Sequence, residues 1–144
     1  MTAVAFHFNA PDKMAYACRL LRKAAAAGAQ VLVTADEETL LQFDQLLWTF
    51  SGTDFVPHCF QDAPKQVLEN TPVVLTQSPP ADATQAILLN LGPDIPAGFE
   101  RFGRIIEIVS EELNDKQQAR SRWKRYASAG CELSSHDLQA TAPR

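Results

Sequence analysis

Short runs of almost wholly apolar residues recur along the chain, and helical patterns follow them early and late in the sequence. Three of them lie at 31–35 (VLVTA), 72–76 (PVVLT) and 86–90 (AILLN), and none alternates polar with apolar residues. This pattern is typical of strands that are buried on both faces of a parallel sheet. Together with the runs at 3–8 (AVAFHF) and 104–109 (RIIEIV), it predicts about five strands.

Helical patterns follow three of these strands. Asp12 is suited to cap a helix that ends near Gly28, which occupies a typical C-cap position. Asp36 precedes a second helix, whose apolar residues continue to about residue 48. A third helix is predicted over about 111–129.

Strands that alternate with helices predict one α/β domain over residues 1–130. We expect a mostly parallel, twisted sheet of about five strands with helices on both faces. The interval 49–72 is interrupted by glycine and prolines and is predicted to be mostly loop. Residues 131–144 are expected to form a C-terminal tail that is partly flexible.

The composition is typical of a single globular protein. The chain has 144 residues, 46% of them hydrophobic, and a net charge of -4, which does not fit a basic nucleic-acid-binding domain. The three cysteines form no CxxC pair and share no metal-ligand spacing with the histidines. No stretch resembles a signal peptide or the roughly 20 apolar residues of a membrane span. We therefore expect a cytoplasmic protein, with no membrane contact and no metal.

Sequence signatures of catalysis and cofactor binding are missing. The predicted sheet is Rossmann-like, but the first strand leads into Asn-Ala-Pro-Asp at 9–12 rather than into a glycine-rich phosphate loop. No GxSxG elbow occurs. The acids Asp36, Glu37 and Glu38 follow a strand, but the start of a helix favours acids there as well. We predict no cofactor, no catalytic residues and hence no enzyme.

The last helix carries an unusual basic segment. Residues 116–126 include five basic residues and no acidic one. Lys116, Arg120, Trp123 and Lys124 are spaced so that they share one helix face. This face could be solvated with Trp123 packed on the core, could contact nucleic-acid phosphates, or could bind an acidic peptide with an apolar anchor. The residues alone leave these three interpretations open.

Aromatic residues crowd the interval that is expected to be loop. Trp48, Phe50, Phe55 and Phe60 lie close to Pro57. Because loops run over the surface, some of these rings are candidates for a protein interface. The alternative is a loop that its own aromatic side chains fix to the core.

These two segments, in this order, resemble the chi subunit family of bacterial DNA polymerase III. The first is Leu46-Leu47-Trp48 followed by Phe55-Val56-Pro57-His58, and the second runs from Ala119 to Tyr126 with Ala129-Gly130 after it. The resemblance implies an accessory, non-catalytic subunit of the clamp-loader assembly. It also implies an α/β fold that is similar to nucleotide-binding folds but lacks the phosphate loop.

The resemblance further implies two binding sites for other proteins. One binds the acidic C-terminal tail of single-stranded DNA-binding protein, so that contact with DNA is indirect. The other binds the psi subunit, and possibly a helicase at the same surface. The implied tail-binding residues are Val109, Lys116, Arg120, Trp123 and Lys124, and the implied psi-binding residues are Trp48, Phe55 and Pro57.

Two other functions remain as alternatives at this point. A small α/β enzyme acting on a nucleotide-type substrate would need a polar pocket near Asn9 and Asp36, at the carboxyl ends of strands. A direct nucleic-acid binder would use the basic helix, although the rest of the chain is acidic.

Overall fold

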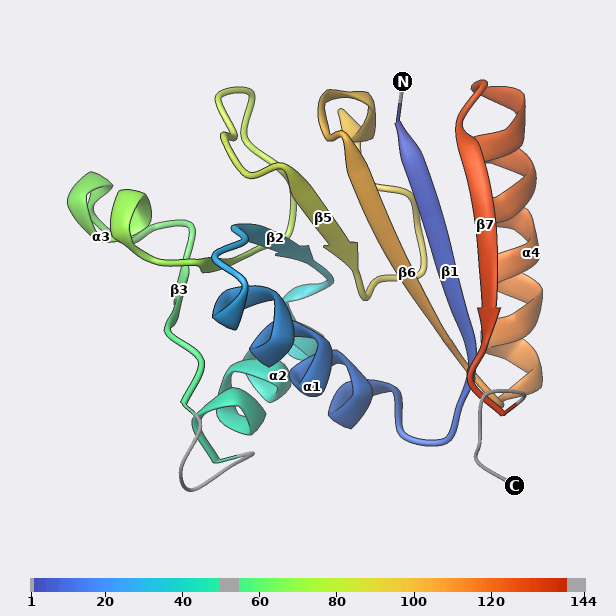
Figure 1. The fold of residues 1–144 in the computed structure, drawn as a ribbon, viewed down its shortest axis with the longest axis horizontal. Coiled ribbons are helices and arrows are strands. Elements are labelled where there is room, and N and C mark those ends of the chain that lie inside the picture. Colours follow the sequence, from blue (N-terminus) through green and yellow to red (C-terminus); the bar gives the residue numbers. More distant parts are fainter. Residues whose placement is uncertain (1, 50–54, 140–144) are drawn as a thin grey trace.

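The computed structural model describes residues 2–49 and 55–139, which form one seven-stranded sheet (Figure 1). All paired strands are parallel, in the order β3-β4-β2-β5-β6-β1-β7. The strands are β1 (Ala3–Ala10), β2 (Val31–Thr34), β3 (His58–Phe60), β4 (Val73–Thr76), β5 (Ile87–Asn90), β6 (Arg104–Ser110) and β7 (Glu132–Asp137). The helices are α1 (Lys13–Ala26), α2 (Glu37–Thr49), α3 (Lys65–Asn70) and α4 (Leu113–Ser128), with a 3-10 turn η1 at Phe99–Arg101.

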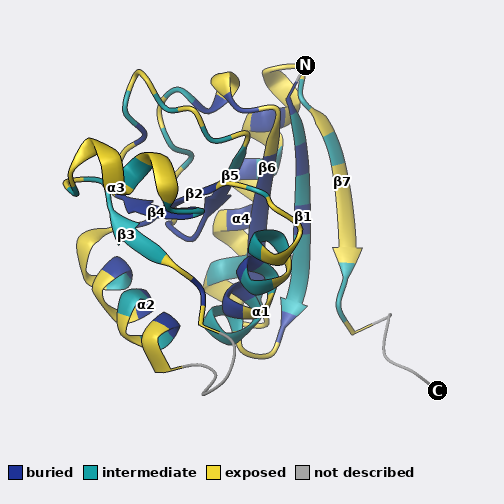
Figure 2. Cartoon of the chain, turned by 60° about the vertical axis from the view of Figure 1, so that its left-hand side comes forward, coloured by how far each residue is buried: buried dark blue, intermediate teal, exposed yellow. Residues whose placement is uncertain are grey.

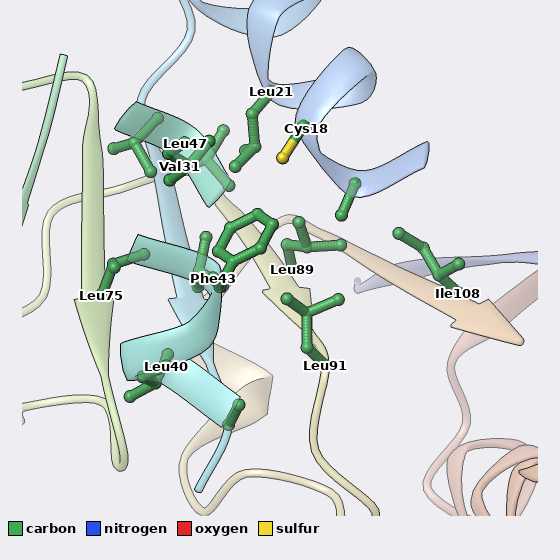
Figure 3. Close-up of a cluster of buried hydrophobic side chains, with 14 of the residues drawn as sticks. Cys18, Leu21, Val31, Leu40, Phe43, Leu47, Leu75, Leu89, Leu91 and Ile108 are labelled. Carbon is green, nitrogen blue, oxygen red and sulfur yellow. The ribbon is translucent and has the colours of Figure 1, made fainter. Parts of the chain in front are cut away.

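Helices cover both faces of the sheet, as the sequence predicted. On one face, Leu21 of α1 and Phe43 of α2 pack against Val31 and its neighbours (Figure 3). On the other face, Tyr126 of α4 belongs to the same cluster as Leu32. Successive residues of β2 therefore point into different apolar clusters, and every residue of β2 and β4 is buried (Figure 2). This arrangement explains why the central strands lack polar residues.

Two strands lie outside the predicted set of about five, and both form edges of the sheet. β3 and the short α3 lie in the interval that was expected to be mostly loop. β7 forms from residues 132–137, which were expected to lie in the flexible tail, and it pairs with β1 along its whole length. An edge strand pairs with a neighbour on one side only, so the polar sequence Ser-Ser-His is tolerated in β7. Because these residues lack the apolar pattern of a strand, the sequence did not indicate β7. Residues 140–144 of the expected tail lie outside the described residues.

Candidate functional site

One open groove collects all five residues that the resemblance implied for tail binding. α4 forms its wall, β1 and β6 form its floor, and β7 borders it. The cavity measures about 510 Å³. We call it the α4 groove, and it is lined by Phe6, Phe8, Asn9, Val109, Lys116, Ala119, Arg120, Trp123, Lys124 and Ser135.

The floor of the α4 groove is apolar. Phe6 and Val109 are almost fully buried, and the rings of Phe6 and Trp123 lie 5.1 Å apart between centroids, tilted by 58°. Trp123 is half-buried, because it packs against the core on one side and lines the groove as well. A floor of this kind favours a ligand with an apolar group that leaves water on binding.

The cationic side chains of the α4 groove have no acidic partner within the described part of the chain. Arg120 and Lys124 are exposed and Lys116 is half-buried, and no carboxylate of residues 2–49 or 55–139 lies within ion-pair distance of any of them. None of the described residues that line the cavity is acidic. Three cations beside an apolar floor suit a ligand that is negatively charged and partly apolar.

A buried polar network fixes which face of α4 points to the groove. Glu107 of β6 is fully buried and accepts hydrogen bonds from Arg122 Nε at 3.0 Å, from the Tyr126 hydroxyl at 2.7 Å and from Asn90 Nδ2 at 2.9 Å. Arg122 Nη1 also donates to the carbonyl oxygen of Pro93. Burial raises the pKa of Glu107, and the Arg122 charge opposes this shift. Arg122 and Tyr126 thus anchor the inner face of α4, while Lys116, Arg120 and Lys124 occupy the face along the groove.

The end of β1 shapes the rim of the groove and was not assigned to it from the sequence. Asn9 has a positive φ of 62°, and the pairing of β1 with β6 shifts register between His7 and Ala10. The Asn9 side chain donates a hydrogen bond to Asp137 at the end of β7, at 2.9 Å. Asn9 and Ser135 line the groove because β7 lies beside β1. Without that strand pairing, no local pattern could indicate them.

A second surface contains the three residues that the resemblance implied for psi binding. The rings of Trp48 and Phe55 stack with 4.9 Å between centroids and an angle of 30°, although 58% of Trp48 and 48% of Phe55 remain exposed. Pro57, two residues after Phe55, is also exposed. We call Trp48, Phe55 and Pro57 the Trp48 patch. Phe50, which the sequence placed with these aromatic residues, lies outside the described residues.

The His58 ring packs against both aromatic rings of the Trp48 patch. Its ring lies 5.2 Å from Trp48 and 5.7 Å from Phe55 between centroids. Both ring nitrogens are hydrogen-bonded. Nε2 lies 3.0 Å from Asp44 Oδ1, and Nδ1 lies 2.7 Å from the carbonyl oxygen of Val56. The two exposed rings therefore rest on a side chain that is fixed to α2 and to the chain before β3.

Leu41 extends the apolar surface along α2 and was not among the residues expected at this surface. It is 53% exposed and precedes Trp48 by seven residues, so both side chains lie on the same helix face, about 10 Å apart along the axis. The seven-residue spacing to Trp48 is visible in the sequence, but the exposure of Leu41 is not. β3 and β7 form the opposite edges of the sheet (Figure 1). The Trp48 patch contacts His58 of β3, whereas the α4 groove is bordered by Ser135 of β7.

The residues considered for a nucleotide-processing site are not brought together. Asn9 lies at the end of β1 and Asp36 follows β2, and two strands separate β1 from β2 in the sheet, so the two are about 14 Å apart or more. Asp36 caps α2, accepting from the Thr39 amide at 3.2 Å and from its hydroxyl at 2.7 Å. The hydrogen bonds from Thr39 lower the pKa of Asp36, as expected for a capping carboxylate. Within the described residues, no group of three His, Cys, Asp or Glu side chains could hold a metal ion, and no helix has the length and hydrophobicity to cross a membrane.

Comparison with known proteins decides the family. The family model described as "DNA polymerase III chi subunit, HolC" matches residues 1–134. The chain belongs to this family. Among chi subunits, the DNA polymerase III subunit chi of Pseudomonas aeruginosa is 34% identical over 127 residues, which cover 88% of this chain and 87% of the relative. The DNA polymerase III subunit chi of Haemophilus influenzae is 29% identical over 124 residues, which cover 85% of each chain. The resemblance to chi subunits is thus confirmed, and it makes the chain an accessory subunit in DNA replication.

Proposed function

We propose that this chain is a non-catalytic adaptor of the replisome in the cytoplasm. Its α4 groove binds the acidic C-terminal tail of single-stranded DNA-binding protein, and its Trp48 patch binds the psi subunit of the clamp loader. A helicase could compete with psi for the Trp48 patch. The chain would then link the polymerase assembly to protein-coated single-stranded DNA without touching the DNA itself.

The pairing of charge with an apolar floor in the α4 groove is the observation that supports this proposal most. A peptide tail with several carboxylates and a terminal Phe would place the ring on Phe6, Val109 and Trp123. Its carboxylates would meet Lys116, Arg120 and Lys124, which have no acidic partner among the described residues. Arginine can grip a terminal carboxylate through two parallel N–H groups, which favours Arg120 for that contact.

Direct nucleic-acid binding explains the same cations less well. Phosphate contacts need positive charge but no apolar floor, and the chain has a net charge of -4. An oligonucleotide that binds with a steep dependence on salt, and that displaces the acidic peptide, would favour this alternative over the adaptor.

The proposal is tested by calorimetric titration with a synthetic peptide that ends in Asp-Asp-Asp-Ile-Pro-Phe. We expect saturable one-to-one binding that weakens as salt is raised, because exposed charges contribute much of the attraction. A peptide without the terminal Phe serves as the matched ligand and should bind far more weakly, since the apolar anchor is lost. Equal affinity of the two peptides, or no binding at low salt, would contradict the tail-binding role.

A further inference from the structure

A second cavity lies on the opposite face of the sheet from the α4 groove. It measures about 480 Å³ and opens between α1 and the strands β1, β5 and β6. Its apolar residues belong to the cluster on the α1 side, whereas those of the α4 groove belong to the cluster on the α4 side. We call it the α1 pocket, and it is lined by His7, Tyr16, Arg19, Leu20, Arg22, Lys23, Ala24, Val31, Ile87, Arg104 and Ile106.

The rim of the α1 pocket is strongly basic. Of the described residues that line it, four carry a full positive charge and none is acidic. Arg19, Lys23 and Arg104 are exposed and make no ion pair with any carboxylate in the part of the chain that the structure describes. Arg19 and Lys23 are four residues apart on α1, a spacing at which like charges repel and destabilise a helix. An acidic ligand would remove this repulsion.

The floor of the α1 pocket is aliphatic rather than aromatic. Leu20, Ile87 and Ile106 contribute apolar surface from one helix and two strands. Tyr16 is the only ring besides His7 in the pocket, and it is engaged on two sides. Its hydroxyl is hydrogen-bonded to His7 Nδ1, and the Arg19 guanidinium carbon lies 5.9 Å from its ring centroid. A nucleobase would need a free aromatic face for stacking, whereas an aliphatic side chain fits this floor.

His7 adds no positive charge to the rim at neutral pH. Burial lowers the pKa of His7 to about 4, with further contributions from His136 and Arg104. The positive charge of the rim therefore comes from its arginine and lysine side chains, of which Arg19, Lys23 and Arg104 are exposed. The chemistry of the α1 pocket is therefore a cationic rim around an aliphatic floor.

We propose that the α1 pocket is a second docking site, for an acidic segment of a partner protein that carries an aliphatic side chain. The aliphatic side chain occupies the floor formed by Leu20, Ile87 and Ile106, and the carboxylates pair with Arg19, Lys23 and Arg104. The α1 pocket and the α4 groove lie on opposite faces of the sheet, so both can be occupied at once. This site does not depend on the identity of the ligand of the α4 groove.

The test uses methyl NMR spectra of the full chain, with Arg120→Ala and Lys124→Ala introduced so that the α4 groove does not compete for the ligand. The probe is the peptide acetyl-Asp-Glu-Asp-Leu-Asp-Glu-amide, with the Leu-to-Ser peptide as matched ligand. We expect saturable shifts of the Ile87 and Ile106 methyl signals with the Leu peptide and much smaller shifts with the Ser peptide. Adding Arg19→Gln, Lys23→Gln and Arg104→Gln should weaken binding at least about tenfold, because three charge pairs are lost.

The control chain carries Lys65→Gln and Arg125→Gln, two exposed cations outside the α1 pocket, and should bind as before. Unfolding of each variant by urea shows that the fold is retained. The proposal is overturned if the three Gln substitutions leave the affinity unchanged, or if the Ile87 and Ile106 methyl signals do not move with the peptide. Shifts caused by oligothymidylate but not by the peptide would assign the pocket to nucleic acid instead and likewise overturn it.

Discussion

Arg120 and Arg125 lie five residues apart on α4, and both are exposed, but only Arg120 lines the α4 groove. Arg125 borders a different cavity, beside Pro93 and Asp94. Substitutions of the two arginines change the net charge equally, but only a substitution of Arg120 removes a contact in the α4 groove. This pair allows a matched comparison on a single helix.

Arg120→Ala should weaken binding of the acidic tail peptide by about 1–3 kcal/mol, because a charged hydrogen-bond donor is lost. Arg120→Lys should recover part of this loss, since lysine keeps the charge but not the planar fork. Calorimetry at one fixed salt concentration measures both. Arg125→Ala is the control and should change the affinity only slightly; equal losses for Arg120→Ala and Arg125→Ala would mean that the groove is not the site.

Glu107 is the residue on which the attachment of α4 depends. Glu107→Gln removes the only carboxylate that pairs with the buried Arg122 in the described part of the chain. We expect a loss of about 3–5 kcal/mol in the free energy of unfolding, because a buried charge is left without its partner. Urea unfolding should show a lower midpoint with an unchanged slope. Glu69→Gln, at an exposed ion pair in α3, is the control and should change the midpoint little; an equally small effect of Glu107→Gln would contradict the anchoring role.

At the scale of elements, the central strands were predictable and the edge strands were not. β2 and β4 are buried on both faces, so their sequences had to be apolar and their pattern identified them. β7 is exposed at most positions. Its sequence therefore does not alternate apolar with polar residues, and no pattern marks it as a strand. β3 has only three residues, all half-buried, between Pro57 and Pro64.

The candidate site was likewise predictable only where its residues lie close together in the sequence. The basic stripe of α4 was predictable because residues four apart share a helix face whatever the rest of the fold does. The floor of the α4 groove was only partly predictable, because Phe6, Phe8 and Ser135 reach it through pairings between distant strands. Leu41 was missed for another reason: its spacing to Trp48 is local, but in the sequence an exposed leucine looks the same as a buried one.

At the scale of the whole molecule, the Trp48 patch and the α4 groove, the two surfaces of the proposed adaptor, lie far apart on the sheet. The Trp48 patch lies near β3, at one end of the strand order. The α4 groove lies over β6, β1 and β7, at the other end. No helix is shared by the two, since Trp48 lies in the last turn of α2 and the cations lie on α4. The chain is thus suited to hold two partners independently.

Trp48→Ala should therefore weaken psi binding by about 2 kcal/mol or more, because truncation of a central aromatic residue in an interface has an effect of this size. The affinity for the tail peptide should remain unchanged. Titration of the purified chain with psi and, separately, with the tail peptide measures both affinities. Leu113→Ala is the control, because Leu113 is 68% exposed but lies outside the Trp48 patch. A loss of tail binding in Trp48→Ala, or full psi binding, would contradict this division.

The position of β1 in the sheet has a consequence for biosynthesis. β1, which begins at Ala3, pairs with β6 and β7, which begin only at Arg104 and Glu132. During translation, the segment that contains Phe6 and Phe8 leaves the ribosome long before Val109, Trp123 or Ser135 can reach it. Long-range parallel pairing of this kind forms slowly and late. The α4 groove thus cannot form before residue 135 has been translated, so a nascent chain that has not reached β7 cannot engage a partner there.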